Sequence, residues 1–283
     1  MYKLIDGKII SAAVKERVKG EVAALNQKGI TVGLAVIIVG EDPASKVYVN
    51  NKKKACEALG IISEEYALAE NTTQEELLSL IDKLNKKESI NGILCQLPLP
   101  KHLDETAVIN AISPDKDVDA FHPVNVGKIM QGDYDFVPCT PAGIMEMLSY
   151  EGIEIAGKTC VVIGRSNIVG KPMSMLLLHK NGTVTICHSK TQNLKEVCQS
   201  ADILVAAVGR PNFVTKDMVK ENAVVIDVGI NRVDSKLVGD VNFNEVCEKA
   251  SYITPVPGGV GPMTIAMLMQ NTLTAAKKQN KVI

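Results

Sequence analysis

Tryptophan is missing from this chain of 283 residues, and aromatic residues make up only 4% of it. The formal charge is −1 at pH 7, from 31 basic and 32 acidic side chains. A nucleic-acid-binding protein needs a positive surface and, for single strands, stacking platforms, so we expect no nucleic-acid partner. The chain also lacks any run of about eighteen apolar residues, which argues against a membrane-spanning helix. Its charged start, MYKLIDGKII, does not resemble a secretory signal.

Paired cysteines are missing too, because the seven cysteines never form a C-x-x-C motif. They predict reduced thiols in a cytoplasmic protein without a disulfide framework or a zinc site. No cluster of His, Asp and Glu has the spacing of metal ligands, so we expect no metal. The G-x-S-x-G motif of many hydrolases is also absent.

The most informative stretch that is present is VVIGRSNIVGKP, residues 161–172. A β-branched strand runs into Gly164, and Gly170 and Pro172 follow where a helix can begin. Such a turn directs backbone N–H groups at an anion, and the pyrophosphate of a dinucleotide is the favoured candidate. The spacing lacks the middle glycine of the usual fingerprint, and Lys171 is not followed by a P-loop hydroxyl. An ordinary strand-to-helix turn therefore remains the alternative.

Alternating helix and strand signals predict an α/β protein of two α/β domains around a cleft. The first domain, 1–140, is completed by a final helix, about 262–283, that folds back on it. The second, 141–261, is a Rossmann-like dinucleotide-binding domain with a mostly parallel sheet. The expected helices cover 10–28, the segment ending at Gly60, 74–87 after Thr72 or Thr73, 139–148, 172–180 and 262–278. The expected strands cover 33–40, 91–100, 159–164, 183–187, 203–209 and 223–229. The Pro-, Asp- and Gly-rich segment 113–143 is expected to be a functional connection.

Chemistry-bearing side chains of the first half lie at strand or loop ends, namely Tyr48, Lys52, Gln96 and Asp119. Open α/β sheets place their ligand crevices there. Tyr48 and Lys52 are four apart and share one helix face, near the expected start of the helix. Partial burial there would lower the pKa of Lys52 and let it relay protons near neutral pH. Lys53 and Lys54 are expected to be solvated.

The segment KDVDAFHP, 116–123, places Asp117 and Asp119 on opposite sides of an extended chain. We expect one of them to pair locally and the other to face a ligand. His122, before a proline, is expected to be structural.

The residues after the second strand of the second domain indicate the cofactor. An aspartate or glutamate there usually binds the ribose of NAD. Here the strand is followed by His188, Ser189, Lys190 and Thr191. This cationic, hydroxyl-bearing stretch favours a 2′-phosphate and hence NADP.

The motifs together resemble the family of bifunctional methylenetetrahydrofolate dehydrogenase / methenyltetrahydrofolate cyclohydrolase, the bacterial FolD type. They cover nearly the whole chain and read YVNNKKKACEALG, GILCQLPLP, PDKDVDAFHPVNVGK, PCTPAGI, VVIGRSNIVGKPMS, VVIDVGIN and ITPVPGGVGPMT. The resemblance implies NADP-dependent oxidation of 5,10-methylenetetrahydrofolate, followed by hydrolysis to 10-formyltetrahydrofolate. It also implies tetrahydrofolate derivatives as substrates and a homodimer.

By this resemblance, Lys52 is the catalytic lysine, Gln96 its partner, Tyr48 the tyrosine beside the folate and Asp119 the partner of the pterin. The implied cofactor contacts are Gly164, Arg165, Ser166, Ser189 and Ile230. The implied substrate contacts also include Leu97, Pro98, Pro257, Gly258 and Gly259. Ala120 departs from the family, which often has glycine there, and this could shift the Asp119 backbone.

Two other readings of the same residues remain. One is another two-domain NADP-dependent dehydrogenase with a lysine and an aspartate, of the shikimate or amino-acid type. The other is a nucleotide sensor without catalysis, for which a retained set of proton-relay residues would have no use.

Overall fold

The computed structural model describes residues 2–234 and 236–282 and divides into two compact units. Unit 1 comprises Met1–Ala12 and Pro138–Thr264, and unit 2 comprises Ala13–Val137 and Ile265–Ile283. The division falls inside two helices, α1 (Gly7–Gln27) and α10 (Val260–Gln279), so each unit is built from segments far apart in the sequence. Within the described ranges, no helix has the combined length and apolar character needed to cross a bilayer.

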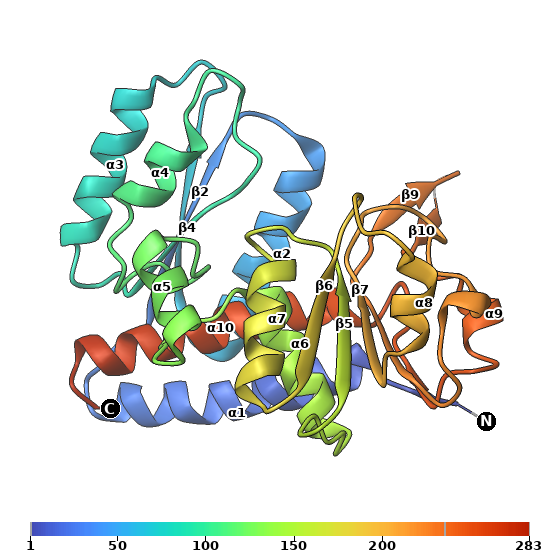
Figure 1. Cartoon of the computed structure of the whole chain (residues 1–283). Coiled ribbons are helices and arrows are strands. Elements are labelled where there is room, and N and C mark those ends of the chain that lie inside the picture. The colour runs from blue at the N-terminus through green and yellow to red at the C-terminus, as the bar shows by residue number, and fades with distance from the viewer. Residues whose placement is uncertain (1, 235, 283) are drawn as a thin grey trace. The chain divides into compact units, whose positions relative to one another are not determined.

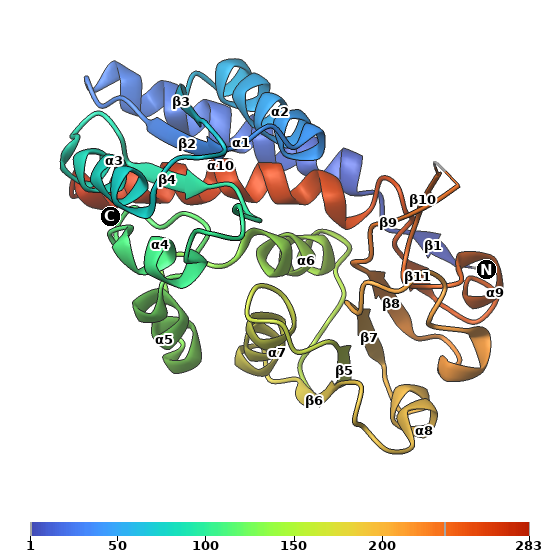
Figure 2. The ribbon, with the colours of Figure 1, turned by 90° about the horizontal axis from the view of Figure 1, so that it is seen from above.

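Unit 1 contains a six-stranded sheet in which every neighbouring pair is parallel, with the order β1-β11-β8-β7-β5-β6. Its strands are β1 (Lys3–Leu4), β5 (Thr159–Ile163), β6 (Thr183–Cys187), β7 (Ile203–Ala206), β8 (Val224–Asp227) and β11 (Tyr252–Ile253). Helices α6 (Cys139–Tyr150) and α7 (Gly170–His179) cover one face, and α8 (Leu194–Gln199) and α9 (Phe243–Val246) cover the other (Figures 1 and 2). The unit also holds a 3-10 turn, η1 (Lys216–Met218), and a hairpin of β9 (Asn231–Val233) and β10 (Lys236–Val238). The predicted parallel sheet is confirmed.

The central strands of this sheet are mostly apolar because helices cover both of their faces. All four residues of β7 and of β8 are buried. Strand β6 differs, since it lies at the sheet edge and exposes Thr185 and Ile186. Successive crossover connections bring the carboxyl ends of β5, β6, β7 and β8 to one edge, where α/β proteins bind their ligands.

Unit 2 contains a three-stranded parallel sheet with the order β3-β2-β4. Its strands are β2 (Gly33–Val39), β3 (Ile62–Leu68) and β4 (Gly92–Cys95), and its further helices are α2 (Pro43–Leu59), α3 (Gln74–Lys86), α4 (Glu105–Ala111) and α5 (Pro123–Gln131). Alternate β2 residues pack with α3 and α4 in one core cluster that includes Ile37, Leu77, Ile81, Ile93 and Val108. Because β2 is buried on both faces, it reads as a continuous apolar run.

Local signals in the sequence set the ends of two of these helices. The Asp42 carboxylate accepts a hydrogen bond from the Ser45 N–H at 2.7 Å and caps α2, which ends at Gly60 with φ +74°. Helix α3 begins after Thr73, which forms a capping box with Glu76. Of the two threonines that the sequence left open, Thr73 is therefore the cap.

Three features differ from the prediction. Strand β3 was not expected, because it lies at a sheet edge and three consecutive polar residues, 63–65, interrupt its apolar signal. The segment 113–143, expected as a connection, contains α5, which the His122 side chain caps. The first twelve residues, expected in the N-terminal domain, lie in unit 1 because β1 pairs with β11.

Lys116 is buried and its ammonium group closes the carboxyl end of α3. Its Nζ donates to the carbonyl oxygens of Leu84 at 3.0 Å and Lys87 at 2.8 Å, and burial lowers its pKa. We expect Lys116→Met to reduce the free energy of unfolding by about 2–3 kcal/mol, because two carbonyls lose their donor. Lys86→Met, which removes an exposed partner of Asp82, should cost less than about 0.5 kcal/mol. Urea unfolding of both variants checks this, and equal costs would contradict the buried cap.

Candidate active site

In unit 2, Lys52 and Gln96 lie in direct contact. Lys52 Nζ donates to Gln96 Oε1 at 2.8 Å, and Gln96 Nε2 donates to the Leu97 carbonyl at 2.8 Å. Gln96 follows β4 directly, and its N–H donates to the Ile37 carbonyl of β2 at 2.8 Å. This bond fixes the backbone of Gln96, and the contact with Leu97 fixes the orientation of its amide, so the oxygen is presented to the lysine. The pair can hold a small polar molecule and exchange a proton with it.

The position of Lys52 on its helix differs from the prediction. Helix α2 begins at Pro43, so Lys52 lies in about its third turn rather than near its start. The macrodipole acts mainly within the first turn, and it therefore has little influence on this ammonium group. Lys52 is half-buried, whereas Lys53 and Lys54 are exposed as expected.

Asp119 contributes a carboxyl group to the same unit. It lines a recess with about 300 Å³ of empty space, its mouth included, whose other walls are mostly apolar and include Leu97, Ile109 and Phe121. Burial raises the pKa of Asp119 to about 6, the positive charge of Lys52 lowers it, and Asp117 adds a smaller upward effect. The influence of Lys52 on Asp119 places the lysine, the amide and the carboxyl group in one electrostatic neighbourhood.

Asp117 has the local role that the sequence left open between the two aspartates. It is buried and accepts hydrogen bonds from the His122 N–H and from Asn125 Nδ2, both at 2.8 Å. His122 Nδ1 accepts from the Val124 N–H at 3.1 Å and caps α5, so His122 is structural as expected. Ala120 adopts φ +58°, in the left-handed region where glycine is preferred, and its side chain is buried. The departure at Ala120 thus falls at a position that favours glycine.

The remaining predicted substrate contacts lie in different units. Tyr48 lies one turn before Lys52 on α2 and exposes 45% of its surface. Leu97 is half-buried and Pro98 is exposed, and the bond between them is cis. Pro257, Gly258 and Gly259 belong to unit 1, between β11 and α10. There the start of α1 approaches them closely, since a Cβ added to Gly7 would lie 1.7 Å from the Gly259 carbonyl oxygen.

The glycine turn of unit 1 connects β5 to α7. A Cβ at Gly164 would lie 2.4 Å from the Ala207 carbonyl oxygen, and one at Gly170 would lie 2.2 Å from the Gly164 carbonyl oxygen. Both positions therefore require glycine for close backbone approach. Ser166 Oγ accepts hydrogen bonds from the N–H groups of Val169 at 3.1 Å and Gly170 at 3.3 Å, which closes the turn.

The other predicted cofactor contacts follow neighbouring strands. Arg165 and Ser166 are exposed in the glycine turn, and Ser189 is exposed after β6. The turn after β6 is closed by Thr191 Oγ1, which accepts from the His188 N–H at 2.8 Å. Ile230 follows β8 and exposes 52% of its surface. The structure thus gathers the five residues at the carboxyl ends of β5, β6 and β8.

These residues fit a dinucleotide. The turn from β5 to α7 has no side chain at its two closest approaches, as a backbone cradle for a pyrophosphate requires. Arg165 and Ser189 offer a cation and a hydroxyl beside it, and the stretch 188–191 contains no carboxylate. This chemistry accommodates a phosphate on the ribose.

Two further sets of residues were not found from the sequence. The first set lines the Asp119 recess and comprises Val108 and Ile109 of α4 and Ile112, which directly follows α4. Apolar residues of a helix give no sequence signal of a binding site. The second set is a pair of buried aspartates, Asp227 and Asp240, in unit 1. The glycines beside them, Gly229 and Gly239, were the available signal, because a buried carboxylate close to the backbone often needs a neighbour without a side chain.

Both halves of the chain match models of one protein family. Residues 5–119 match "Tetrahydrofolate dehydrogenase/cyclohydrolase, catalytic domain", and residues 138–280 match the "NAD(P)-binding domain" of the same family. The chain is 66% identical to the bifunctional protein FolD of Acetivibrio thermocellus over 281 residues, which cover 99% of each chain.

Solved structures of the same family resemble this chain over nearly its whole length. The bifunctional methylenetetrahydrofolate dehydrogenase/cyclohydrolase FolD of Campylobacter jejuni is 52% identical, with a TM-score of 0.96 over 99% of this chain and 100% of that one. The enzyme of Trypanosoma brucei, solved with NADP and an inhibitor, is 41% identical, with a TM-score of 0.94 over 99% of both chains. These likenesses extend over both units of the chain.

Proposed function

This chain belongs to the tetrahydrofolate dehydrogenase/cyclohydrolase family and is a bifunctional enzyme of one-carbon metabolism, and we propose which of its residues carry the two activities. It oxidises 5,10-methylenetetrahydrofolate to 5,10-methenyltetrahydrofolate with NADP⁺, and it hydrolyses that product to 10-formyltetrahydrofolate. The family membership excludes the readings as a shikimate-type dehydrogenase and as a sensor. The roles of the individual residues form the proposal.

Lys52 and Gln96 carry the hydrolysis, and the observation that supports this most directly is their 2.8 Å hydrogen bond beside Asp119. In its neutral form the lysine positions the attacking water at the one-carbon bridge and accepts its proton, while the amide oxygen of Gln96 accepts a hydrogen bond from the lysine and holds it in place. Water adds to the methenyl carbon, one carbon–nitrogen bond breaks, and a proton is released. Tyr48, exposed one turn away on α2, packs against the folate ring system.

Asp119 recognises the pterin. With a pKa of about 6, its carboxyl group is mostly ionised at neutral pH and accepts hydrogen bonds from the amide edge of the pterin ring. Leu97 lines the same recess, and Pro98 follows it in the chain.

Unit 1 holds the cofactor through Gly164, Arg165, Ser166, Ser189 and Ile230. NADP⁺, when bound, supplies the hydride acceptor for the oxidation. The backbone at Gly164 receives the pyrophosphate, and Arg165 and Ser189 recognise the 2′-phosphate that distinguishes NADP from NAD. In functional terms, residues 13–140 with about 262–283 form the folate-binding catalytic domain, and 141–261 form the NADP-binding domain, whose sheet β1 extends. The free cysteines suit a cytoplasmic location.

An absorbance time course with 5,10-methylenetetrahydrofolate and either NADP⁺ or NAD⁺ tests the function. We expect reduced cofactor to accumulate while methenyltetrahydrofolate rises and then falls, with faster reaction for NADP⁺. Methenyltetrahydrofolate that accumulates without enzymatic hydrolysis, or a preference for NAD⁺, would contradict the assignment.

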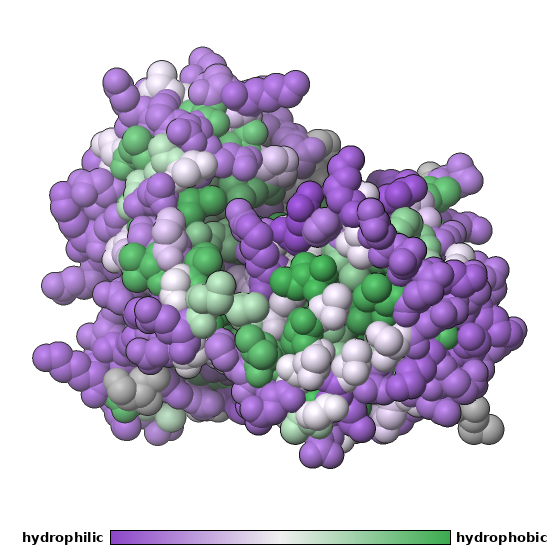
Figure 3. Space-filling view, in the orientation of Figure 1, coloured by the Kyte–Doolittle hydropathy of each residue, from purple (hydrophilic) through white to green (hydrophobic). Residues whose placement is uncertain are grey.

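We further propose that the protein is a homodimer in which a second copy covers the exposed edge of β6. Ile186 exposes 38% and Leu178 of α7 exposes 50% of its surface, and apolar residues gather over β6 and α7 (Figure 3). An unpaired apolar edge strand favours association with another chain. Analytical ultracentrifugation should show twice the mass of the 30.4 kDa chain. Ile186→Lys should yield monomers, whereas Ile62→Lys on the β3 edge should not; a monomeric wild type would contradict the proposal.

A further inference from the structure

Two buried aspartates of unit 1, Asp227 and Asp240, organise the loops at the carboxyl ends of β7 and β8. Asp240 Oδ2 accepts hydrogen bonds from the N–H groups of Val208 at 2.7 Å and Gly209 at 2.9 Å, and its Oδ1 accepts from the Arg210 N–H at 2.9 Å. Asn231 Nδ2 also donates to Oδ1, at 2.9 Å. One carboxylate therefore holds residues 208–210 of the loop that follows β7, and also Asn231, the residue that follows Ile230.

Asp227, the last residue of β8, supports Asp240 in turn. Its Oδ1 accepts from the N–H groups of Gly229 at 2.9 Å and Asp240 at 2.8 Å, and its Oδ2 accepts from the Val241 N–H at 3.0 Å. Its own N–H donates to Thr254 Oγ1 at 2.7 Å. Burial raises the pKa of Asp227 to about 6, and the three backbone donors oppose that rise. The two carboxylates thus connect three segments: the loop after β7, the end of β8 and the segment that follows β10.

Each aspartate lies against a glycine that its partner segment supplies. A Cβ at Gly239 would lie 1.8 Å from Asp227 Oδ2, and a Cβ at Gly229 would lie 2.2 Å from Asp240 Oδ1. A side chain at either position would displace a carboxylate. Because Asp240 is completely buried and Asp227 nearly so, only a closely fitted set of donors can stabilise these groups.

The sheet order shows which half of a dinucleotide these loops face. The pyrophosphate cradle follows β5, and β6, on one side of β5, leads to the adenosine ribose. Strands β7 and β8 lie on the other side of β5, so their loops face the nicotinamide half. The loop after β7 also touches the cradle, since the Ala207 carbonyl oxygen is the atom that a Cβ at Gly164 would meet.

We propose that Asp240 is a positioning residue that holds the loop 208–210 and the turn carrying Ile230 in the conformation that binds the nicotinamide half of NADP. The assignment rests on the proposed function, since it deepens the cofactor role of unit 1. Asp240 acts through backbone N–H groups and touches no reacting atom. A carboxylate is required because both of its oxygens accept from two donors. An asparagine would turn its NH₂ group toward two of those donors.

The test is Asp240→Asn, compared with the wild type by calorimetric titration with NADPH and with adenosine 2′,5′-bisphosphate. The second probe carries only the adenosine half and its 2′-phosphate. We expect the Kd for NADPH to rise about tenfold or more and the Kd for the bisphosphate to change less than about twofold. In the protein without cofactor, the amide protons of residues 208–210 should exchange about tenfold faster or more. Hydrolysis of methenyltetrahydrofolate, measured without cofactor, should stay within about twofold, because Lys52 and Gln96, which carry it, lie in unit 2.

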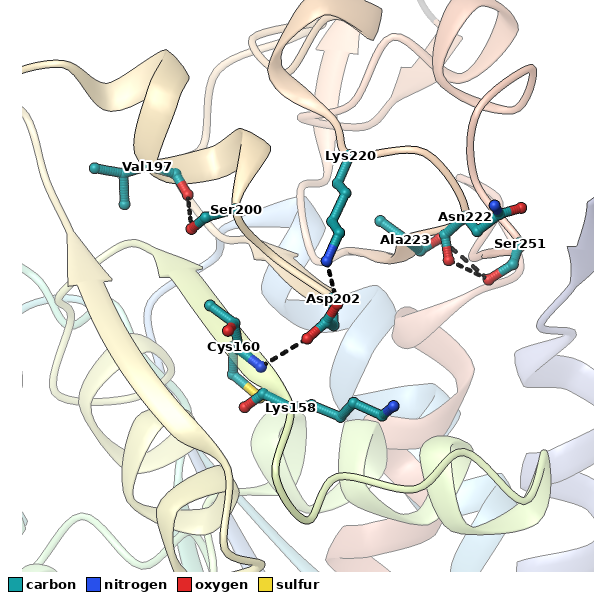
Figure 4. Close-up of polar contacts among 10 residues, drawn as sticks. Lys158, Cys160, Val197, Ser200, Asp202, Lys220, Asn222, Ala223 and Ser251 are labelled. Carbon is teal, nitrogen blue, oxygen red and sulfur yellow. Dashed lines mark hydrogen bonds and ion pairs between the residues drawn. The ribbon is translucent and has the colours of Figure 1, made fainter.

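Asp202→Asn is the matched control. Asp202 precedes β7 at the opposite end of the same sheet, accepts from the Thr159 N–H at 2.9 Å and pairs with Lys220 at 2.6 Å (Figure 4). It also links backbone segments through a carboxylate, yet it faces no cofactor loop. This variant should bind NADPH as the wild type does.

A folded Asp240→Asn protein that binds NADPH within about twofold of the wild type would overturn the proposal, as would equal weakening for both probes. If Asp240→Asn does not fold, Asn231→Ala removes a single donor and should raise the Kd for NADPH about threefold or more. An unchanged Kd in that variant would also overturn it. A wild-type protein that bound neither probe would instead refute the proposed cofactor role itself, before any variant is compared.

Discussion

Replacing Lys52 by methionine is expected to lower the cyclohydrolase rate by about 100- to 10,000-fold, the usual contribution of a positioned acid–base group. Methionine keeps an unbranched apolar stem but loses the nitrogen that donates to Gln96 Oε1. Binding of NADP should remain, because the residues assigned to the cofactor lie in unit 1. The measurement is the decay of methenyltetrahydrofolate absorbance, with NADPH binding measured in parallel.

Lys53→Met provides the control for that experiment. Lys53 is the next residue on the same helix, and it is exposed. It should hydrolyse methenyltetrahydrofolate at the wild-type rate. Unchanged hydrolysis by Lys52→Met would remove the lysine from the mechanism.

Asp119→Asn should lower activity and at the same time stabilise the protein at high pH. Burial raises the pKa of Asp119 from 3.8 to about 6, although the charge of Lys52 opposes the shift. The folded state therefore holds the proton more tightly than the unfolded state. The contribution of Asp119 to the free energy of unfolding is therefore most favourable below pH 4. It is lost as the pH rises through about 6, and above pH 7 the protein is less stable by up to about 3 kcal/mol.

Asparagine resembles the protonated acid, so the variant avoids this cost. We expect almost no change in the free energy of unfolding at pH 4 and an increase of up to about 3 kcal/mol at pH 8. The folate kcat/KM should fall about 10- to 100-fold, because an amide replaces a charged acceptor worth about 1.5–3 kcal/mol per hydrogen bond. Asp115→Asn, which changes an exposed carboxylate nearby, should alter neither quantity. The quantity to compare is the free energy of unfolding of Asp119→Asn minus that of the wild type. If this difference is smaller at pH 8 than at pH 4, burial does not raise the pKa of the Asp119 carboxyl group.

Elements with strong local signals were predicted well from the sequence. Gly60 ends α2 and Thr73 starts α3 because the signals for helix ends lie within a few residues of the ends themselves. The buried strands β2, β7 and β8 were predicted from their runs of mostly apolar residues. Strand β3 did not, since one of its faces is polar and only its pairing with β2 makes it a strand.

In the candidate site, too, features set by neighbouring residues were predicted from the local sequence, whereas features set by long-range contacts were not. Local geometry predicted that one of the two aspartates in 116–123 would pair within its own loop, and only the structure identifies it as Asp117. The contact between Lys52 and Gln96, which are 44 residues apart, followed only from the resemblance of the motifs. Asp240 could not be recognised, because its donors at 208–210 come from another strand connection and only the folded sheet brings them together. Long-range hydrogen bonds to the backbone leave no periodic pattern in a sequence.

A crystal structure of the protein with a stable analogue of 5,10-methenyltetrahydrofolate tests the central claim most directly. The account predicts the pterin edge on the Asp119 carboxylate, the ring system against Tyr48, and the one-carbon bridge within hydrogen-bonding reach of a water held by Lys52. An analogue bound away from these three side chains, or a Lys52 ammonium group directed into bulk solvent in the complex, would contradict it.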